Sequence, residues 1–342
     1  MKKKLNFALV GCSGFIAKKH VSAIKKLNHN LKIVLDKSDS AGYLDSYFPD
    51  CIFFKDQKSF FSNLVKYKID FVILCLPNYL HFRFIELSLK KKCNVICEKP
   101  TVIKSVDLDK IDKLEKQYKK KCYSIFQLRH DKELIKLQKK LKKSKKKFVG
   151  KLTYITSRGD WYVKSWKGDE KLSGGIIYNI GIHFFDLLSW FFGDAINGKR
   201  IIVSKKTQSG FIQFKNAKIK WMLSTDRNKL PNKKIFAYRN FKIGNQDIDF
   251  QLGLKIIIDA NIQLDEIINS LKIDFTWDYN EDLKSQYLDL REEPVVNFKL
   301  LGEKYISNIY DIISPNAKWS KGYFGFLQFV TLIMISDKLK EV

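Results

Sequence analysis

Two side chains that can move protons or stabilise charge stand out in this sequence: Lys99 in "ICEKP" and His183 in "YNIGIHFFDLLSW". Histidine ionises near neutral pH, so it can take a proton from a hydroxyl group. A lysine ammonium can lower the pKa of a nearby hydroxyl group or polarise a carbonyl group. These residue types therefore indicate acid-base chemistry at a carbon–oxygen bond.

His183 is one of five histidines in the chain, and it lies in an apolar stretch with two further polar groups at helical spacing. Asn179 precedes it by one turn and Asp186 follows it by about one turn, which predicts a helix. The phenylalanines and leucines of this helix would pack into the core, while Asn179 and His183 face the reacting groups. We expect Asp186 to bond to the backbone or within the helix environment.

Lys99 follows Glu98 and precedes a proline at the end of a strand-like run. Burying an ion pair at such a place is costly without a purpose, so the pair marks a functional site. We also predict a cis bond between Lys99 and Pro100, because proline is the residue that makes cis peptide bonds accessible. Such a bond would aim the lysine side chain.

The elements that position these residues form two predicted domains. Residues 1–130 alternate strands and helices, with continuously apolar strands, which predicts an α/β Rossmann domain with a parallel sheet covered on both faces. Residues 131–342 change to period-two alternation after residue 150, which predicts an α+β domain built on a mostly antiparallel sheet. Its last part, residues 255–342, is divergent, with a helix-like "LDEIINSL" and an apolar C-terminal helix at 324–335.

A glycine-containing turn, "ALVGCSGFIAKKH", joins the first strand to the first helix. Gly11, Gly14 and Ala17 give G-x-x-G-x-x-A, in which Ser13 stands in for the middle glycine of the dinucleotide fingerprint. Small residues let the backbone approach a pyrophosphate, which a helix N-terminus attracts. Asp36 ends the second strand, where a carboxylate binds the ribose hydroxyls and repels a 2′-phosphate. We therefore predict NAD as the cofactor.

Further cofactor contacts are predicted at the carboxyl ends of the parallel strands, where ligands of such sheets bind. Pro77, Asn78 and His81 follow the fourth strand, although Asn78 could equally be a plain helix cap. Gln127 and Arg129 end the sixth strand at the same edge. The complete predicted cofactor set is Gly11, Ser13, Gly14, Phe15, Ile16, Asp36, Pro77, Asn78, His81, Glu98 and Gln127.

A polar, aromatic loop, "RGDWYVKSWKGDEKLSGG", precedes the His183 helix. Its aromatic rings can stack on sugar or uracil rings, and its basic side chains can pair with a carboxylate or a diphosphate. The Gly174–Gly175 pair permits close approach of backbone or ligand. The predicted substrate-binding set is Lys99, Arg158, Trp161, Tyr162, Trp166, Lys167, Asn179 and His183.

The composition excludes some other classes of protein. The net charge is +27, but only seven of the 63 basic residues are arginines. Specific nucleic-acid recognition leans on arginine, so we predict no specific nucleic-acid partner, with weak polyanion binding as an alternative. The lysine run at 139–147 fits a solvated helix face.

Membrane and metal sites are also not expected. No uninterrupted apolar run reaches the roughly 18 residues that cross a bilayer, and the basic N-terminus lacks the apolar stretch of a signal peptide. The six cysteines lie mostly in apolar strand runs and include no CxxC pair. We therefore predict a cytoplasmic protein with no membrane partner and no metal site.

Several stretches together resemble the Gfo/Idh/MocA family of NAD(P)-dependent sugar oxidoreductases. They are "GFIAKKH", "CLPNYLH", "ICEKP", "FQLRH" and "SWKGDEKLSGG" followed by "NIGIHFFD". More narrowly, they resemble the UDP-N-acetyl-2-amino-2-deoxyglucuronate 3-dehydrogenases of bacterial surface-polysaccharide (lipopolysaccharide O-antigen) biosynthesis. The resemblance covers about residues 5–230. It implies that Lys99 and His183 are the catalytic residues, and that Asn179, where many members carry aspartate, orients the sugar or the imidazole.

The resemblance implies oxidation of the 3-hydroxyl of UDP-N-acetylglucosaminuronate to a 3-keto product. His183 would act as the base, Lys99 would stabilise the alkoxide and NAD would take the hydride. A homo-oligomer, a dimer or a tetramer, is expected, with 2-oxoglutarate as a candidate recycling oxidant. The alternatives are a dehydrogenase of another sugar or of an inositol, and a catalytically idle member that binds NAD or a sugar nucleotide.

Overall fold

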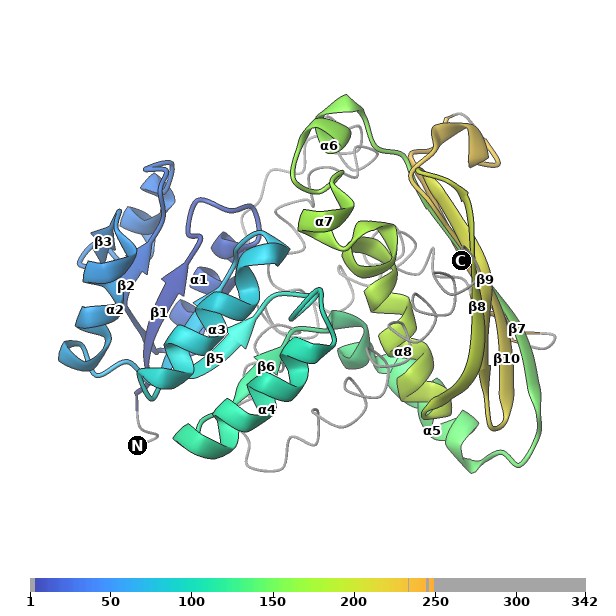
Figure 1. The fold of residues 1–342 in the computed structure, drawn as a ribbon, viewed down its shortest axis with the longest axis horizontal. Coiled ribbons are helices and arrows are strands. Elements are labelled where there is room, and N and C mark those ends of the chain that lie inside the picture. The colour runs from blue at the N-terminus through green and yellow to red at the C-terminus, as the bar shows by residue number, and fades with distance from the viewer. Residues whose placement is uncertain (1–3, 233, 244–245, 249–342) are drawn as a thin grey trace, which may run out of the picture.

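The chain folds into two domains, each built on a six-stranded sheet (Figure 1). The structure is a computed structural model that describes residues 4–232, 234–243 and 246–248. The helices predicted at "LDEIINSL" and at 324–335, and the divergent segment 255–342 as a whole, lie outside the described residues.

The N-terminal domain is the expected Rossmann domain, with a parallel sheet in the order β3-β2-β1-β4-β5-β6. Its central strands form because their apolar side chains are buried on both faces. The strands are β1 (Asn6–Val10), β2 (Asn30–Leu35), β3 (Ile52–Phe54), β4 (Phe71–Leu74), β5 (Asn94–Cys97) and β6 (Cys122–Ser124). The helices are α1 (Ala17–Lys26), α2 (Gln57–Lys66), α3 (His81–Lys90) and α4 (Val106–Tyr118), with short helical turns η1 (Gly42–Ser46), η2 (Asn78–Leu80) and η3 (Gln127–His130).

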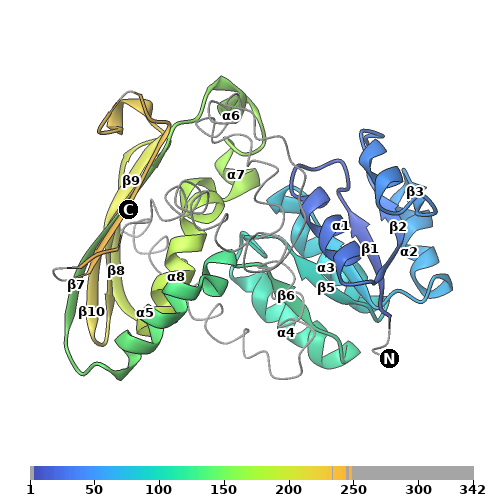
Figure 2. The ribbon, with the colours of Figure 1, turned by 180° about the vertical axis from the view of Figure 1, so that it is seen from behind.

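The second domain places α5 and α8 on the inner side of its sheet, toward the Rossmann domain (Figure 2). Its strands are β7 (Phe148–Thr156), β8 (Ala195–Ser204), β9 (Thr207–Phe214), β10 (Ala217–Ser224), β11 (Ala237–Ile243) and β12 (Gln246–Ile248). Its helices are α5 (Lys132–Lys143), α6 (Asp160–Lys164), α7 (Glu170–Ser173) and α8 (Ile182–Phe192), with turns η4 (Ile177–Gly181) and η5 (Arg227–Lys229). The predicted domain boundary at residue 130 stays a prediction.

The prediction of a mostly antiparallel second sheet was wrong, because the sheet is mixed. Its order is β12-β11-β7-β10-β9-β8, and the central pair, β7 and β10, runs parallel. The chain leaves β7, passes through α8 and the β8–β9 hairpin, and returns on β10 in the direction of β7. A parallel pair needs such a long crossover, which strand patterns alone do not reveal.

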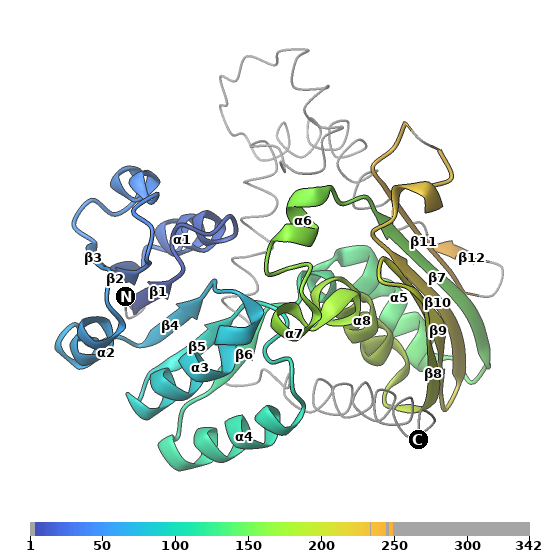
Figure 3. The same cartoon turned by 45° about the horizontal axis from the view of Figure 1, so that its top comes forward.

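One continuous apolar cluster joins the two domains and holds the catalytic region in place. It runs from the β1 and β4 face of the first sheet through α8 to the inner face of the second sheet. Figure 3 shows α8 lying between the two sheets. The lysines of α5 form its solvated face, as expected for the run at 139–147.

The stretch Glu170–Phe192 is, by length and hydropathy, the one candidate for a membrane span among the described residues. It is not an uninterrupted apolar run, because it contains charged and polar residues such as Glu170, Asn179 and Asp186. In addition, 78% of its most apolar window is buried inside the protein. The left-handed Gly174 and Gly175 interrupt it, so it is not one continuous helix. The stretch therefore packs as part of the core.

Candidate active site

The turn between β1 and α1 fits the backbone approach that a dinucleotide needs. Gly11 has a φ of 85°, and a Cβ added to it would lie 2.4 Å from the carbonyl oxygen of Cys75. A Cβ on Gly14 would lie 3.1 Å from the Gly11 carbonyl oxygen. The turn can therefore pack this closely on itself and on the segment after β4 only because these positions carry no side chain, which matches the use of glycine at a pyrophosphate site. Phe15 is exposed and Ile16 immediately precedes α1.

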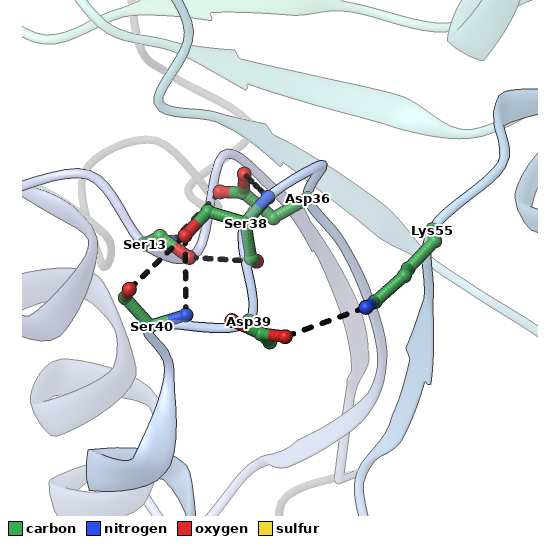
Figure 4. Close-up of polar contacts among 6 residues, drawn as sticks. All are labelled: Ser13, Asp36, Ser38, Asp39, Ser40 and Lys55. Atoms are coloured by element: carbon green, nitrogen blue, oxygen red, sulfur yellow. Dashed lines mark hydrogen bonds and ion pairs between the residues drawn. The ribbon is translucent and has the colours of Figure 1, made fainter.

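Asp36 is fixed against this turn at the carboxyl end of β2 (Figure 4). One carboxylate oxygen accepts from the Ser13 backbone N–H at 2.8 Å, and the other accepts from the Ser38 N–H at 3.0 Å. The Ser13 hydroxyl donates to the Ser38 carbonyl oxygen at 3.1 Å. Each carboxylate oxygen keeps a lone pair for a further donor. The residues present therefore fit the adenosine ribose of NAD, with Asp36 at the hydroxyls.

Replacing Asp36 with alanine is expected to weaken NADH binding about 10- to 100-fold, because a charge-assisted hydrogen bond contributes about 1.5–3 kcal/mol. The affinity for NADPH should fall much less, since the repulsion of its 2′-phosphate is also removed. Fluorescence titration with both cofactors measures this. Asp39→Ala is the matched control, because this exposed carboxylate lies on the same loop as Asp36 and pairs with Lys55 after β3 (Figure 4). Equal losses for NADH and NADPH would contradict the assignment.

Asn78 and His81, both predicted as cofactor contacts, serve other contacts in the structure. The Asn78 amide donates to the backbone oxygen of Ser173 in the second domain at 2.8 Å, so Asn78 is not a plain cap. His81 is fully buried, with its ring nitrogens 2.7 Å from the Pro100 oxygen and 2.8 Å from the Leu76 oxygen. These bonds join the β4 and β5 ends. The cofactor contact of His81 stays a prediction.

Glu98 is buried at the end of β5 and contacts the dinucleotide-binding helix. Its carboxylate lies 2.9 Å from Nε2 of His20 on α1. Its negative charge also raises the pKa of Lys99. Glu98 therefore links helix α1 to the neighbouring Lys99. The direct contacts of Glu98, Pro77 and Gln127 with NAD stay predictions.

Lys99 reaches from the first domain to the segment that carries His183. The predicted cis Lys99–Pro100 bond is confirmed. The Lys99 ammonium donates to the Asn179 backbone oxygen at 2.9 Å. Burial lowers the pKa of Lys99 to about 8, opposed by Glu98 and reinforced by the positive charges of Lys167 and Arg158. Lys99 is thus mostly protonated at neutral pH, and it loses its proton as the pH rises past about 8.

Asn179 lies in a π-helical turn and not in the regular helix that the sequence suggested. Residues Ile177–Gly181 form a π-helical turn, and α8 begins only at Ile182, so the segment is not one regular helix. The Asn179 side-chain amide donates to the Tyr162 hydroxyl at 3.0 Å, while the Asn179 backbone oxygen accepts from the Lys99 ammonium. The role of its side chain in orienting the sugar or the imidazole stays a prediction. Asn179 joins Lys99 to the loop before α8, and π-helical turns of this kind often occur at functional sites.

His183 lies in the first turn of α8, near Lys99. Burial lowers its pKa well below the usual 6.5, and the positive charges of Lys99 and Arg239 add to the effect while Glu98 opposes it. A histidine accepts a proton only when it is neutral. His183 is therefore in the form that a general base requires at neutral pH.

Asp186 forms a buried ion pair that sequence reasoning did not find. Both of its oxygens accept from Arg129, from Nε at 2.8 Å and from Nη2 at 2.6 Å, and Asp186 is 1% exposed. Arg129 follows β6, as Asn78 follows β4 and Lys99 follows β5. Three neighbouring strand ends thus each bond to the segment between Ser173 and Asp186, which fixes it against the Rossmann domain.

Replacing Arg129 alone with leucine is expected to lower the free energy of unfolding by about 3–5 kcal/mol, because Asp186 is left buried without its partner. The double replacement Arg129→Leu with Asp186→Leu should restore most of this loss. Thermal and urea unfolding measure both. The exposed Lys90–Glu86 pair gives the control, where Lys90→Leu should change stability by less than about 1 kcal/mol. A double variant as unstable as the single one would refute this account.

The aromatic loop brings its basic side chains over aromatic rings. The Lys167 ammonium lies 5.4 Å from the ring centre of Trp161 and 5.8 Å from that of Trp166, and the Arg158 guanidinium lies 5.8 Å from that of Tyr162. Burial and the charge of Arg158 lower the pKa of Lys167. The predicted substrate-binding side chains Arg158, Tyr162, Lys167 and Lys99 therefore lie together, with Trp161 and Trp166 around Lys167.

Sequence reasoning missed Arg239 and His20. Arg239 lies on β11, and its charge is close enough to His183 to lower the pKa of the imidazole. The signal was present, because Arg239 is two residues before the fully buried Phe241 and therefore shares its face of the strand. The described residues contain no group of three or more metal-ligating side chains.

Two segments match the profiles of one protein family. Residues 5–126 match an oxidoreductase family, NAD-binding Rossmann fold, and residues 146–229 match its C-terminal alpha/beta domain. A putative oxidoreductase, YteT, from Bacillus subtilis (strain 168) is 28% identical over 133 residues, 37% of this chain and 30% of the relative. The match thus spans less than a third of that relative.

Solved structures give broader matches. The WlbA (WbpB) dehydrogenase from Thermus thermophilus, in complex with NAD and alpha-ketoglutarate, is 34% identical with a TM-score of 0.70, over 72% of this chain and 82% of that one. The same dehydrogenase in complex with NAD and UDP-GlcNAcA gives 34% identity and a TM-score of 0.69, and the match covers 72% of this chain and 83% of that one. Myo-inositol 2-dehydrogenase from Lactobacillus plantarum, at 13% identity and a TM-score of 0.71 over 99% and 98%, shares the fold.

Proposed function

This chain belongs to the Gfo/Idh/MocA oxidoreductase family of NAD-dependent dehydrogenases, and within it we propose the oxidation of the 3-hydroxyl of UDP-N-acetylglucosaminuronate (UDP-GlcNAcA) to a 3-keto sugar nucleotide. The observation that carries the proposal is the neutral His183 beside the cationic Lys99, in a site whose other charged groups are mostly basic. A 34% identical dehydrogenase binds UDP-GlcNAcA, which supports the substrate.

The two reacting side chains would have complementary roles. His183 removes the proton of the substrate hydroxyl, because its imidazole is neutral at neutral pH. The Lys99 ammonium stabilises the negative charge that develops on that oxygen, and its bond to the Asn179 carbonyl fixes its position. NAD supplies the hydride acceptor when it is bound.

The charge of the site matches an anionic substrate rather than a neutral sugar. Arg158 and Lys167 lie close enough to Lys99 to lower the pKa of its ammonium by repulsion. Such clustering of like charges is unfavourable unless an anion binds among them. The diphosphate and the carboxylate of UDP-GlcNAcA provide that anion, and Trp161 is exposed for stacking on a ring.

We also propose a place for the reaction in a biosynthetic sequence. A 3-keto group prepares the carbon for transamination, which supports the synthesis of an amino-sugar nucleotide for surface polysaccharide, and we propose that it takes place in the cytoplasm. We propose 2-oxoglutarate as the oxidant that regenerates NAD, because a relative binds alpha-ketoglutarate and the cationic site suits a dicarboxylate. We also propose that the chain forms a homo-oligomer, either a dimer or a tetramer.

The pH profile of kcat/KM is expected to be bell-shaped, because it reports the ionisation of the free enzyme. Activity should rise with pH as His183 becomes neutral, with the midpoint below 6.5. It should fall above pH 8 as Lys99 loses its proton, since the pKa of that lysine is about 8. Initial rates between pH 5 and pH 10 measure the profile. A rate that still climbs beyond pH 9 would show that the cationic form of Lys99 is not needed.

The function is tested by incubating the purified protein with NAD and a panel of substrates: UDP-GlcNAcA, UDP-N-acetylglucosamine (UDP-GlcNAc) and myo-inositol. Mass spectrometry identifies the oxidised product, and parallel reactions contain 2-oxoglutarate. We expect a product two mass units lighter from UDP-GlcNAcA, and 2-hydroxyglutarate where 2-oxoglutarate is added. Oxidation of myo-inositol alone, or of no substrate by protein that binds NAD, would overturn the proposal.

A further inference from the structure

Arg239 is a charged residue near the reacting pair that none of the roles above uses. It lies on β11 directly opposite Tyr154 of β7 in the sheet register. Its guanidinium carbon is 5.1 Å from the Tyr154 ring centre, and Nη2 is 3.4 Å from the Tyr154 hydroxyl. The Tyr154 ring packs at 4.7 Å from that of Phe184, the residue after His183. The arginine is therefore held in place beside the catalytic helix.

Among the residues that the structure describes, no anion pairs with the charge of Arg239. Its Nε is shielded from solvent and has no hydrogen-bond acceptor within the described part of the chain. A shielded donor without an acceptor is costly, and because Arg239 as a whole is only half-buried, its guanidinium stays open to an acceptor from a ligand.

Arg158 has the same arrangement next to the other reacting group. Its guanidinium lies over the Tyr162 ring, and its Nε is also shielded without an acceptor among the described residues. The charge of Arg158 acts on Lys99, whereas the charge of Arg239 acts on His183. Each member of the reacting pair thus has its own arginine, and each arginine is positioned by a tyrosine.

The chemistry of a uronate nucleotide matches two such arginines. The pyranose ring carries the diphosphate on C1 and the carboxylate on C5, and both carbons are two positions away from C3. When the 3-hydroxyl lies between Lys99 and His183, one anionic group therefore extends on each side of it. The planar fork of an arginine suits both groups, because it bonds carboxylate or phosphate through two parallel N–H donors.

We propose that Arg239 binds the C5 carboxylate of the sugar and selects a uronate over a neutral hexosamine nucleotide, while Arg158 faces the diphosphate. The assignment of the carboxylate rests on the proposed function. Arg239 is then a specificity-determining residue, and it lies on a strand of the second domain outside both segments that match the family profiles.

The test measures the equilibrium binding of UDP-GlcNAcA and of UDP-GlcNAc to the protein saturated with NADH. The wild-type protein should bind UDP-GlcNAcA more tightly than UDP-GlcNAc. Arg239→Gln should weaken UDP-GlcNAcA roughly 10- to 100-fold and UDP-GlcNAc far less, because only the carboxylate loses a charge-assisted bond. Arg239→Lys keeps the charge but not the fork, so it should retain part of the preference. Arg227→Gln, at an exposed arginine on η5, is the matched control.

The outcomes separate this inference from the proposed function. If the wild-type protein prefers UDP-GlcNAcA, Arg239→Gln removes the preference, and no oxidation occurs, the binding inference stands and the proposed function fails. If Arg239→Gln weakens both nucleotides equally, or neither, the inference is overturned even where oxidation is observed. It is also overturned if the wild-type protein binds the two nucleotides equally. Thermal unfolding of each variant identifies a loss of folding. If Arg239→Gln does not fold, the relative affinity of Arg239→Lys for UDP-GlcNAcA and UDP-GlcNAc decides whether the inference stands.

Discussion

Replacing His183 with asparagine is expected to lower kcat about 10²- to 10⁴-fold, the range that a general base contributes. The imidazole is neutral, half-buried and close to Lys99, and asparagine has no basic nitrogen that could take its place. The affinity for NADH should stay unchanged, because the dinucleotide turn lies in the other domain, between β1 and α1. Steady-state rates and a fluorescence titration with NADH measure the two effects.

A matched histidine elsewhere provides the control for this substitution. His29 lies in the Rossmann domain just before β2, where Nδ1 accepts from the Leu5 backbone N–H at 3.3 Å. His29→Asn should leave kcat within about twofold of the wild-type value, because His29 lies just before the start of β2 and Lys99 follows the end of β5, at the opposite edge of the parallel sheet. Activity that survives His183→Asn would remove the imidazole from the mechanism.

Replacing Lys99 with methionine is expected to lower kcat about 10²- to 10³-fold, as the loss of one charge-stabilising donor does in other enzymes. Methionine keeps much of the side-chain length but cannot stabilise an alkoxide or bond to the Asn179 carbonyl. The residual activity should also lose the decline above pH 8, because the group with a pKa of about 8 is gone. Initial rates across the pH range report both effects.

Lys104→Met is the control, because Lys104 is an exposed lysine in the segment that follows Lys99 and Pro100. It should leave the rate and its pH dependence unchanged. A Lys99→Met variant that retained the decline above pH 8 would assign that ionisation to another group, and full activity would remove Lys99 from the reaction.

Much of the Rossmann domain was predictable, because parallel strands buried on both faces are continuously apolar and read clearly in a sequence. The same logic placed Lys99 at a strand end. The cis Lys99–Pro100 bond, which is confirmed, was predicted from the proline. The Gly11 turn was predictable because a positive φ beside a neighbouring carbonyl group requires glycine.

The details of the second domain were not predictable from local pattern. The parallel β7–β10 pair depends on where the chain returns after a long crossover. The π-helical turn at Ile177–Gly181 redirects the Asn179 amide to Tyr162, which regular helical spacing could not indicate. The ion pair of Arg129 with Asp186 joins residues 57 positions apart, so only the folded chain brings them together.

The most direct test of the central claim uses UDP-GlcNAcA that carries deuterium on C3. If Lys99 and His183 act on the 3-hydroxyl, the C3 deuterium must be transferred to the nicotinamide. We expect deuterated NADH by mass spectrometry, a 3-keto product without the label, and a slower single-turnover rate than with unlabelled substrate. Unlabelled NADH formed together with a product that retains its deuterium would contradict the account, because oxidation would then occur at another carbon.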